Sequence, residues 1–216
     1  MPVTVKMTSD FICPWCLIGE KRLFQAIETL PDGIEVDVEW LPFELNPDMQ
    51  PRGMDRKIYR SLKFGSWERS LELDAHTVAA SRDVDVSFDY GAITRTPNTF
   101  LAHRLSWLAA QQGKQRPVVA AILSAYFEQG HDIGDVETLA AIAAEQGLDP
   151  EAVETALAGD VGADEVRQLE QETVSRGVHG VPHFMIGETS ISGAQPAAIL
   201  RDVILLEHTR LNDLVA

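Results

Sequence analysis

Cys13-Pro14-Trp15-Cys16 (CPWC) decides the fold of this chain, and it contains the only two cysteines among 216 residues. The motif follows residues 3–7 (VTVKM), a run typical of a buried strand, and precedes residues 17–27 (LIGEKRLFQAI), whose apolar spacing is typical of a helix. The free N–H groups and dipole of a helix N-terminus stabilise an anion, so a thiolate there has a pKa below the ordinary value of about 8.5. Proline is tolerated in the first helical turn. The motif therefore predicts a redox-active cysteine pair.

The composition is that of a globular protein, with 45% hydrophobic and 24% charged residues. The length predicts one domain, or one domain with a large insertion. The net charge of −15 opposes binding to nucleic acids and to anionic membranes, because both require a basic surface. No apolar run approaches the ~18 residues that a membrane span needs. We therefore expect neither a nucleic acid nor a membrane as a partner.

The start of the chain and its cysteine count predict a cytoplasmic protein. The first strand begins by Val3, so nothing resembling the basic start and apolar core of a signal peptide precedes it. Thiols are kept reduced in the cytosol, and two cysteines cannot form a disulfide framework. The pair is then catalytic or metal-binding. A structural zinc ion needs four ligands, commonly from two CxxC motifs, and there is no second CxxC. We favour redox chemistry and expect no metal.

The first 45 residues predict a βαβ unit. A short buried strand is expected at 4–8, a helix at 14–30 and a half-exposed strand at 34–41, with a turn at Pro31-Asp32-Gly33 between helix and second strand. Strands joined through a helix are parallel, with a right-handed crossover.

The middle of the chain predicts only helices. Thr96-Pro97 is expected to start one of them, with a threonine cap and proline in the first position. Asp135 and Asp149 are expected to cap two others. The expected helices cover residues 54–64, 67–82, 98–112, 116–129, 135–146, 150–158 and 163–176.

Strand character returns near the end of the chain, at 183–186 and 190–192, and a last helix is expected at 196–213. Sheet elements at both ends with helices between them predict a discontinuous α/β domain that carries a helical insertion. We place the boundaries as follows: the first part of the sheet domain at 1–45, the insertion at 46–162 and the second part of the sheet domain at 163–216.

A second motif, Gly180-Val181-Pro182-His183, places a proline immediately before a strand. Proline is the residue that supports a cis peptide bond at low cost. From these residues alone, a cis bond and an ordinary trans turn both stay open.

The order of these elements resembles the DsbA-like branch of the thioredoxin-fold oxidoreductases. Within that branch, residues 10–19 (DFICPWCLIG) and 98–105 (NTFLAHRL) are similar to the FrnE-like subfamily. The resemblance spans essentially the whole chain. It implies a thioredoxin fold, βαβ…ββα, with a large all-helical insertion.

The resemblance also implies a set of site residues. The Val181–Pro182 bond is expected to be cis and to face the cysteines, so that Pro182 belongs to the catalytic site. The backbone of Val181 is expected to accept strand-like pairing from the substrate, a mode that tolerates many sequences. Pro14 and an exposed Trp15 would belong to the docking surface.

Four polar residues have competing interpretations. Asn98 and His103 are expected either to contact substrate in a groove above the cysteines or to be structural. In the structural case, Asn98 caps a helix and His103 is a buried core histidine. His179 and His183 are either an ordinary loop residue and strand residue or neighbours of the cysteines. In the second case they would complete a Cys₂His₂ zinc site, or a protonated histidine would stabilise a thiolate.

We therefore expect a thiol–disulfide oxidoreductase that acts on protein or small-molecule disulfides. Cys13 is expected to be the exposed nucleophile and Cys16 the buried cysteine that resolves the mixed disulfide. The sequence does not set the direction of electron flow. We expect no bound cofactor, exchange with glutathione or a thioredoxin system, and a monomer or homodimer.

Two other functions use the same features. One is a glutathione-dependent isomerase of the 2-hydroxychromene-2-carboxylate type, which shares the fold. Those enzymes carry a serine where Cys13 stands and lack the second cysteine, so the cysteine pair argues against this function. The other is a redox-linked metal-binding or chaperone-like module, in which both cysteines would be dispensable.

Overall fold

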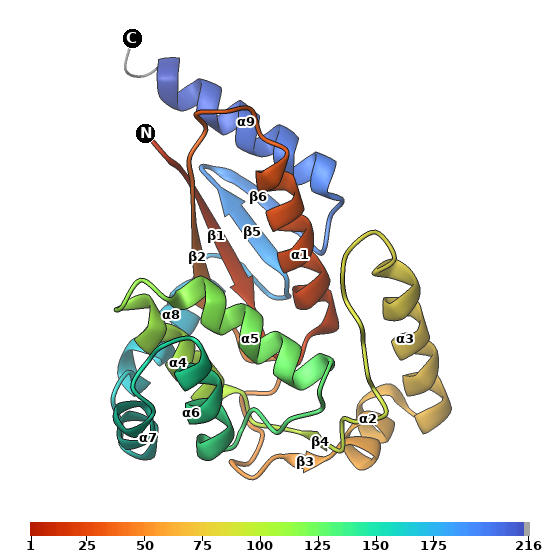
Figure 1. Cartoon of the computed structure of the whole chain (residues 1–216). Coiled ribbons are helices and arrows are strands. Elements are labelled where there is room, and N and C mark those ends of the chain that lie inside the picture. The colour runs from red at the N-terminus through yellow and green to blue at the C-terminus, as the bar shows by residue number, and fades with distance from the viewer. Residues whose placement is uncertain (214–216) are drawn as a thin grey trace.

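This computed structural model describes residues 1–213. A four-stranded mixed sheet in the order β2-β1-β5-β6 brings together the two ends of the chain (Figure 1). Strands β1 and β2 are parallel, as the βαβ pattern predicted, and β5 runs antiparallel to both β1 and β6. The bounds of the strands are Val3–Ser9 for β1, Val36–Pro42 for β2, His183–Ile186 for β5 and Thr189–Ser192 for β6.

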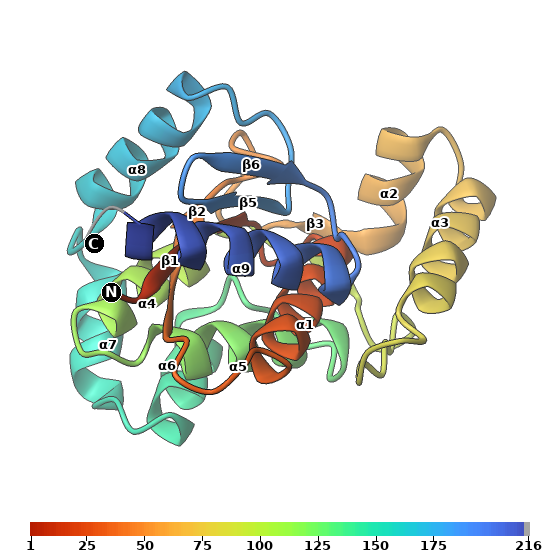
Figure 2. The same ribbon diagram turned by 90° about the horizontal axis from the view of Figure 1, so that it is seen from above.

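Two helices lie side by side against this sheet: α1 (Pro14–Glu28) and α9 (Ala197–Asp213) (Figure 2). Alternate residues of β1, among them Val5 and Met7, are fully buried, and so is Leu23 on α1. Burying an aliphatic side chain of this size stabilises a fold by about 1.5–3 kcal/mol. The packing fixes α1 against the centre of the sheet and so fixes the position of its N-terminus.

Seven helices connect β2 to β5. They are α2 (Arg56–Phe64), α3 (Trp67–Ala80), α4 (Phe100–Ala110), α5 (Gln115–Phe127), α6 (Val136–Glu145), α7 (Pro150–Ala158) and α8 (Ala163–Ser175). Helices α2 and α3 form a hairpin that stands apart from the other helices (Figures 1 and 2). Helix α8 contacts both β2 and α4. Within residues 1–213, no helix combines the length and the apolar character needed to cross a membrane.

Side-chain caps fix the starts of several helices. Asp135 accepts a hydrogen bond from the Thr138 backbone N–H, and Asp149 accepts bonds from Glu151 and Ala152, as expected for both aspartates. Asp55 caps α2 in the same way. Such caps contribute about 1 kcal/mol each.

A small second sheet was not predicted. Strand β3 (Met54–Asp55) pairs with β4 (Arg95–Thr96), so α2 begins at Arg56 rather than at residue 54. The predicted helix start at Thr96-Pro97 was wrong for the same reason. The backbone of Thr96 is engaged in the pairing with Met54, and α4 begins only at Phe100.

Candidate active site

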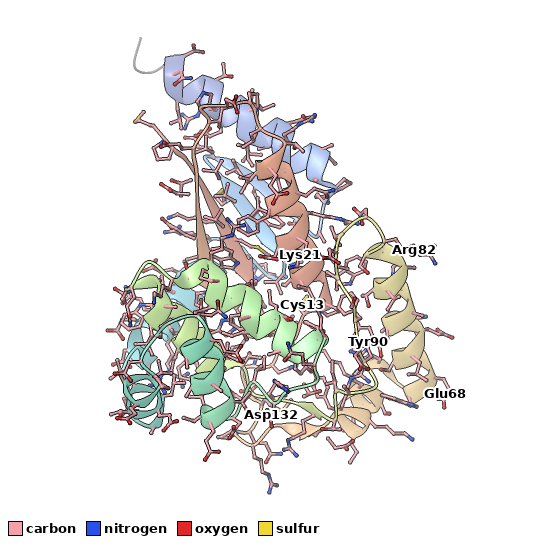
Figure 3. The ribbon with its side chains drawn as sticks, in the orientation of Figure 1. Cys13, Lys21, Glu68, Arg82, Tyr90 and Asp132 are labelled. Atoms are coloured by element: carbon pink, nitrogen blue, oxygen red, sulfur yellow. The ribbon has the colours of Figure 1, made fainter. Side chains whose placement is uncertain are left out.

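The cysteine pair lies at the start of α1, as the motif predicted. Cys13 is the N-cap residue, and Pro14 follows in the first turn. The Cys13 N–H donates to the carbonyl of Asp10 at 3.1 Å, and the Cys16 N–H donates to the carbonyl of Cys13 at 2.9 Å. The first turn of α1 itself contains no acidic residue that would offset the positive end of the helix dipole. Figure 3 labels Cys13 at the end of α1 that faces the helical segments.

Both cysteines are buried, which corrects the expectation of an exposed Cys13. Cys13 is 5% exposed and Cys16 is fully buried. Burial, followed by a hydrogen bond with Cys13, raises the pKa of the Cys16 thiol well above its ordinary value. Trp15 is half-buried rather than exposed, because its ring packs edge-on against His76 at a centroid distance of 5.5 Å. The cover over Cys13 comes in part from the α2–α3 hairpin, which lies more than forty residues away along the chain.

The proline loop faces the cysteines. The Val181–Pro182 peptide bond is cis, as the resemblance implied. The Cys13 thiol donates a hydrogen bond to the Val181 carbonyl, with 3.6 Å between sulfur and oxygen. The loop approaches α1 at Gly19, where an added Cβ would lie 3.0 Å from Cγ of Pro182 and 3.2 Å from Cζ of Phe184. Glycine at this position is what allows the loop to lie so close to the helix.

A pocket of about 300 Å³ opens at Cys13, between the start of α1 and the α2–α3 hairpin. Pro14 and Trp15 form part of its wall. Most polar residues of the wall come from the hairpin, and its charged residues and aromatic polar residues there are Tyr59, Arg60, Lys63, Asp74 and His76.

The hairpin wall contains a buried ion-pair cluster. Asp74 accepts hydrogen bonds from Arg56 at 2.6 Å and from Arg60 at 2.7 Å, and all three side chains are at most 15% exposed. Burial lowers the pKa of Arg60. Lys63 lies further along α2 and bonds to two neutral groups, Oδ1 of Asn46 at 3.0 Å and the Tyr59 hydroxyl at 2.6 Å.

A second titratable cluster lies behind Cys13, around the fully buried Asp10. One carboxylate oxygen of Asp10 accepts the backbone N–H of Leu45 at 2.7 Å, and the other lies 3.5 Å from Nε2 of His103. Burial, followed by repulsion from Glu170, raises the pKa of Glu44 to about 7. Burial also raises the pKa of Glu170. Glu44 and Glu170 therefore bind protons more strongly than free carboxyl groups do.

The structure does not bring Asn98 and His103 into the pocket at Cys13. Asn98 accepts the Phe100 N–H through its side chain and donates to the Met49 carbonyl, so it fixes the loop before α4. His103 is 3% exposed and packs against Phe11 with ring centroids 4.9 Å apart. His103 therefore lies in the core, whereas Asn98 holds the loop one residue before Thr99, the N-cap residue of α4.

His179 and His183 likewise lie outside any metal-binding arrangement. Nε2 of His183 is 2.7 Å from the Ser190 hydroxyl, and burial lowers its pKa. His179 is exposed. Across residues 1–213, no three histidine, cysteine or acidic side chains are grouped so that they could hold a metal ion.

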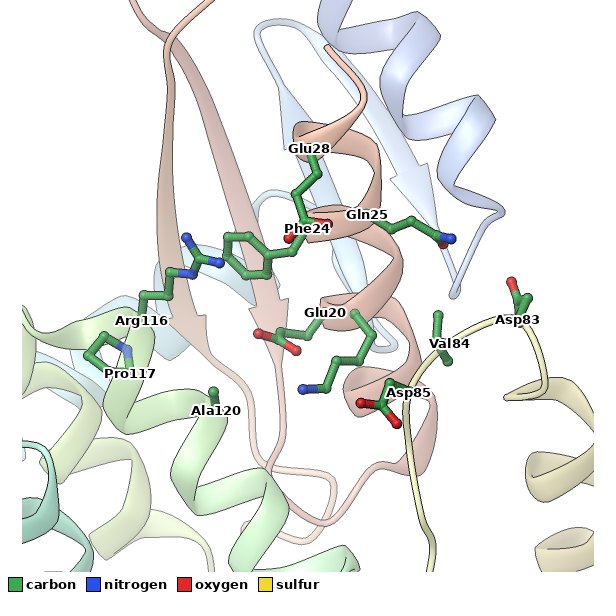
Figure 4. Close-up of a pocket in the computed structure, with 11 residues that line it drawn as sticks. Glu20, Phe24, Gln25, Glu28, Asp83, Val84, Asp85, Arg116, Pro117 and Ala120 are labelled. Atoms are coloured by element: carbon green, nitrogen blue, oxygen red, sulfur yellow. The ribbon is translucent and has the colours of Figure 1, made fainter.

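A separate hollow of about 440 Å³ lies between α1, α5 and residues 83–85 (Figure 4). Glu20 points into it from α1, is 3% exposed, and has a pKa raised by burial. Arg116 enters from α5 and stacks over the ring of Phe24 at 3.7 Å. Glu20 lies about two helical turns beyond Cys13, and neither cysteine lines this hollow, so it is distinct from the reactive pair.

The residues that the hairpin contributes to the site, including Tyr59, Arg60 and Lys63, were not predicted from the sequence. A signal for them was present. Residues 52–63 contain five of the 18 lysines and arginines of an acidic chain. Glu44 and Glu170 had no such signal, because 126 positions separate them and only the fold brings them together around Asp10.

The chain is similar to known proteins in sequence and in fold. Residues 4–205 match the family of DSBA-like thioredoxin domains. Protein YwbO of Bacillus subtilis is 31% identical over 211 residues, which cover 97% of this chain and all of that protein. A crystal structure described as a probable DsbA oxidoreductase from Streptomyces coelicolor is 30% identical, with a TM-score of 0.86 over 96% of this chain and 90% of that one. A 2-hydroxychromene-2-carboxylate isomerase shares the fold at 15% identity, with a TM-score of 0.75 over 98% of each chain.

Proposed function

Because this chain belongs to the family of DSBA-like thioredoxin domains, we propose that it is a thiol–disulfide oxidoreductase whose reacting groups are Cys13 and Cys16. The observation that carries the proposal is the geometry of the pair. One sulfur is at the N-cap of α1, beside the Val181 carbonyl and at the edge of a pocket, and the second is one turn further into the helix and buried.

The exchange takes place in two steps. The Cys13 thiolate attacks one sulfur of a substrate disulfide, so a mixed disulfide forms and the first substrate thiolate leaves. The Cys16 thiolate then attacks the Cys13 sulfur, which releases the second substrate thiolate and leaves a Cys13–Cys16 disulfide. Two electrons pass from the protein dithiol to the substrate. An external thiol reverses the same steps and restores the dithiol.

The buried environment of Cys16 supports the proposed division of roles. A thiol with a raised pKa and no exposure is a poor nucleophile toward an external disulfide. Inside the mixed disulfide, however, the Cys13 sulfur lies within its reach, so proximity favours the second step. We place the exchange in the cytoplasm, because both cysteines belong to the reactive pair and none is left for a structural disulfide.

A redox titration tests this function. The protein is equilibrated with glutathione buffers of varied ratio, the remaining thiols are alkylated after an acid quench, and the oxidised fraction is measured by mass. We expect a reversible two-electron transition, for which a tenfold change in the equilibrium constant is about 30 mV. The measured potential then sets the direction of electron flow. Absence of a disulfide at every ratio would refute the proposal.

Single-cysteine variants separate the two roles. Cys16→Ser should react with a disulfide and stop at a stable mixed disulfide. Cys13→Ser should form no mixed disulfide under the same conditions. An isomerase that needs neither sulfur for exchange would keep its activity in Cys16→Ser, which distinguishes the alternative function.

A further inference from the structure

The pocket at Cys13 differs in charge from the molecule as a whole. The chain carries a net charge of −15. Helix α2, which forms one wall of the pocket, contains four basic residues and no acidic residue. A cleft whose charge is opposite to the net charge raises the local concentration of ligands that the rest of the surface repels.

The positive charge of this wall is only partly neutralised. Arg56 and Arg60 share the single carboxylate of Asp74, which leaves one positive charge in excess. Lys63 adds a second, because the groups to which it bonds, Asn46 and the Tyr59 hydroxyl, are neutral. Among residues 1–213, Lys63 forms no ion pair with a carboxylate. Two positive charges without full compensation therefore lie in the wall of the pocket that Cys13 also lines.

The size of the pocket and the burial of Cys13 limit what can reach this sulfur. A volume of about 300 Å³ is at the lower end of the range for small-molecule sites. Cys13 is 5% exposed, and Trp15 and the α2–α3 hairpin stand around it. A disulfide fixed in the surface of a folded protein cannot bring its sulfur to such a thiol without displacing the hairpin. A small, flexible disulfide can enter as it is.

We propose that the pocket selects low-molecular-weight disulfides whose ends carry carboxylates, and that Lys63 binds one of these carboxylates while Cys13 attacks the disulfide. This inference rests on the exchange chemistry proposed above and names its substrate class. In the reaction, the protein dithiol loses two electrons and two protons, and the disulfide becomes two carboxylate-bearing thiols. Lys63 is then the residue that determines specificity, and Arg56 and Arg60 support it through their excess charge.

The test uses three disulfides of nearly equal size: 3,3′-dithiodipropionate (anionic), 2-hydroxyethyl disulfide (neutral) and cystamine (cationic). Each oxidises the reduced wild-type protein in a single turnover, followed by tryptophan fluorescence. Because the three differ in leaving-group reactivity, each rate constant is divided by the rate constant of the same disulfide with dithiothreitol. We expect the normalised rate constant to be at least tenfold higher for the anionic than for the cationic disulfide at low salt. The ratio should decline as salt is added.

Two lysine variants on the same helix identify the group responsible. Lys63→Gln should lower the anionic rate constant about fivefold, as expected for one charge pair across about 4 Å of water, and leave the neutral disulfide unaffected. Lys57→Gln is the matched control. Lys57 is exposed, its Nζ lies 5.9 Å from the centre of the Trp67 ring, and it does not line the pocket. Equal losses in the two variants would attribute the preference to the general field and overturn the assignment of Lys63.

Two further measurements complete the test. Insulin, a folded protein with disulfides, should oxidise Cys13 more slowly than 3,3′-dithiodipropionate; a faster reaction with insulin would overturn the inference. Calorimetry with the double variant Cys13→Ser/Cys16→Ser should show binding of 3,3′-dithiodipropionate that is lost when Lys63→Gln is added. The double variant performs no exchange, so its binding of 3,3′-dithiodipropionate is measured independently of the proposed function. If the wild type formed no redox couple but this binding still depended on Lys63, only the proposed function would be refuted. Equal normalised rates for all three disulfides would refute the inference alone.

Discussion

Replacing Asp74 by asparagine removes the carboxylate that Arg56 and Arg60 share. Its two oxygens accept hydrogen bonds from Nη2 of Arg56 at 2.6 Å and from Nη2 of Arg60 at 2.7 Å. The Asp74 side chain is 7% exposed. In Asp74→Asn, the amide oxygen can accept from one guanidinium only, and the amide NH₂ faces the other. Two buried cations are then left without an anion, and their mutual repulsion is no longer offset.

Loss of one partner from a buried ion pair costs about 3–5 kcal/mol, because the remaining charge stays buried. The matched control is Glu72→Gln, two residues earlier on the same helix. Glu72 pairs with Arg69 at 2.7 Å, but both side chains are more than half exposed. A surface pair of this kind contributes about 0.5 kcal/mol or less. The two substitutions make the same chemical change, so the difference between them measures the effect of burial.

The measurement is urea unfolding of wild type and both variants at pH 7, followed by fluorescence and by circular dichroism. A thermal melt of the same proteins gives a second measure. For a chain of this length, each kcal/mol shifts the melting temperature by about 2–4 °C, so Asp74→Asn should melt about 6–20 °C below wild type. An Asp74→Asn variant within about 1 kcal/mol of wild type, with an unchanged dependence on urea, would refute the argument that this cluster is buried and charged.

Two further substitutions probe the acidic cluster and the proline loop. Glu44→Gln should leave the free energy of unfolding unchanged near pH 4 and increase it by about 1–2 kcal/mol at pH 8. The folded-state pKa of Glu44 is raised from 4.5 to about 7, so its ionised form destabilises the folded state above that range, and solvent around this partly exposed group screens part of the cost. Urea unfolding at the two pH values measures this, and a gain that is equal at both would contradict the raised pKa. Gly19→Ala should lower the free energy of unfolding by about 1–2 kcal/mol, although alanine has the higher helix propensity. The reason is that neither Pro182 nor the fully buried Phe184 can move away from the added methyl group. A Gly19→Ala protein more stable than wild type would show that the proline loop can move to make room.

The fold could be predicted from the sequence wherever the determining pattern is local. The period of apolar residues around the CPWC motif specified β1, α1 and the parallel β2. The Asp149 cap followed by Pro150 marked the start of α7 at the correct residue. Patterns that depend on distant pairing failed. Thr96 has the local signature of a helix cap, yet its backbone pairs with Met54, forty-two positions earlier. The energy of that pairing is invisible in any short stretch of sequence.

The site was predictable to the same extent. Cys13 and Cys16 were recognisable because their spacing and their place before a helix are local features. The burial of Cys16 was expected, but that of Cys13 was not, since the covering residues of the hairpin, such as Tyr59 and His76, come from a segment that the motif does not specify. Net charge is a property of the whole chain and does not describe a single pocket. The value of −15 coexists with four basic residues on α2, which forms one wall of the pocket at Cys13.

Burial of Cys13 and the charge of its pocket have a common structural origin in the α2–α3 hairpin. The hairpin covers the sulfur, and its two helices are joined through the pairs of Asp74 with Arg56 and Arg60. Arginine is suited to this position because its guanidinium stays charged when buried, whereas a lysine would lose its proton more readily. The cluster therefore holds the cover in place and also supplies the excess charge, so a change that weakens the cluster alters both the access to Cys13 and the selection of ligands. Stability and specificity are for this reason not independent at this site, and kinetic comparisons of hairpin variants need the free energy of unfolding measured alongside.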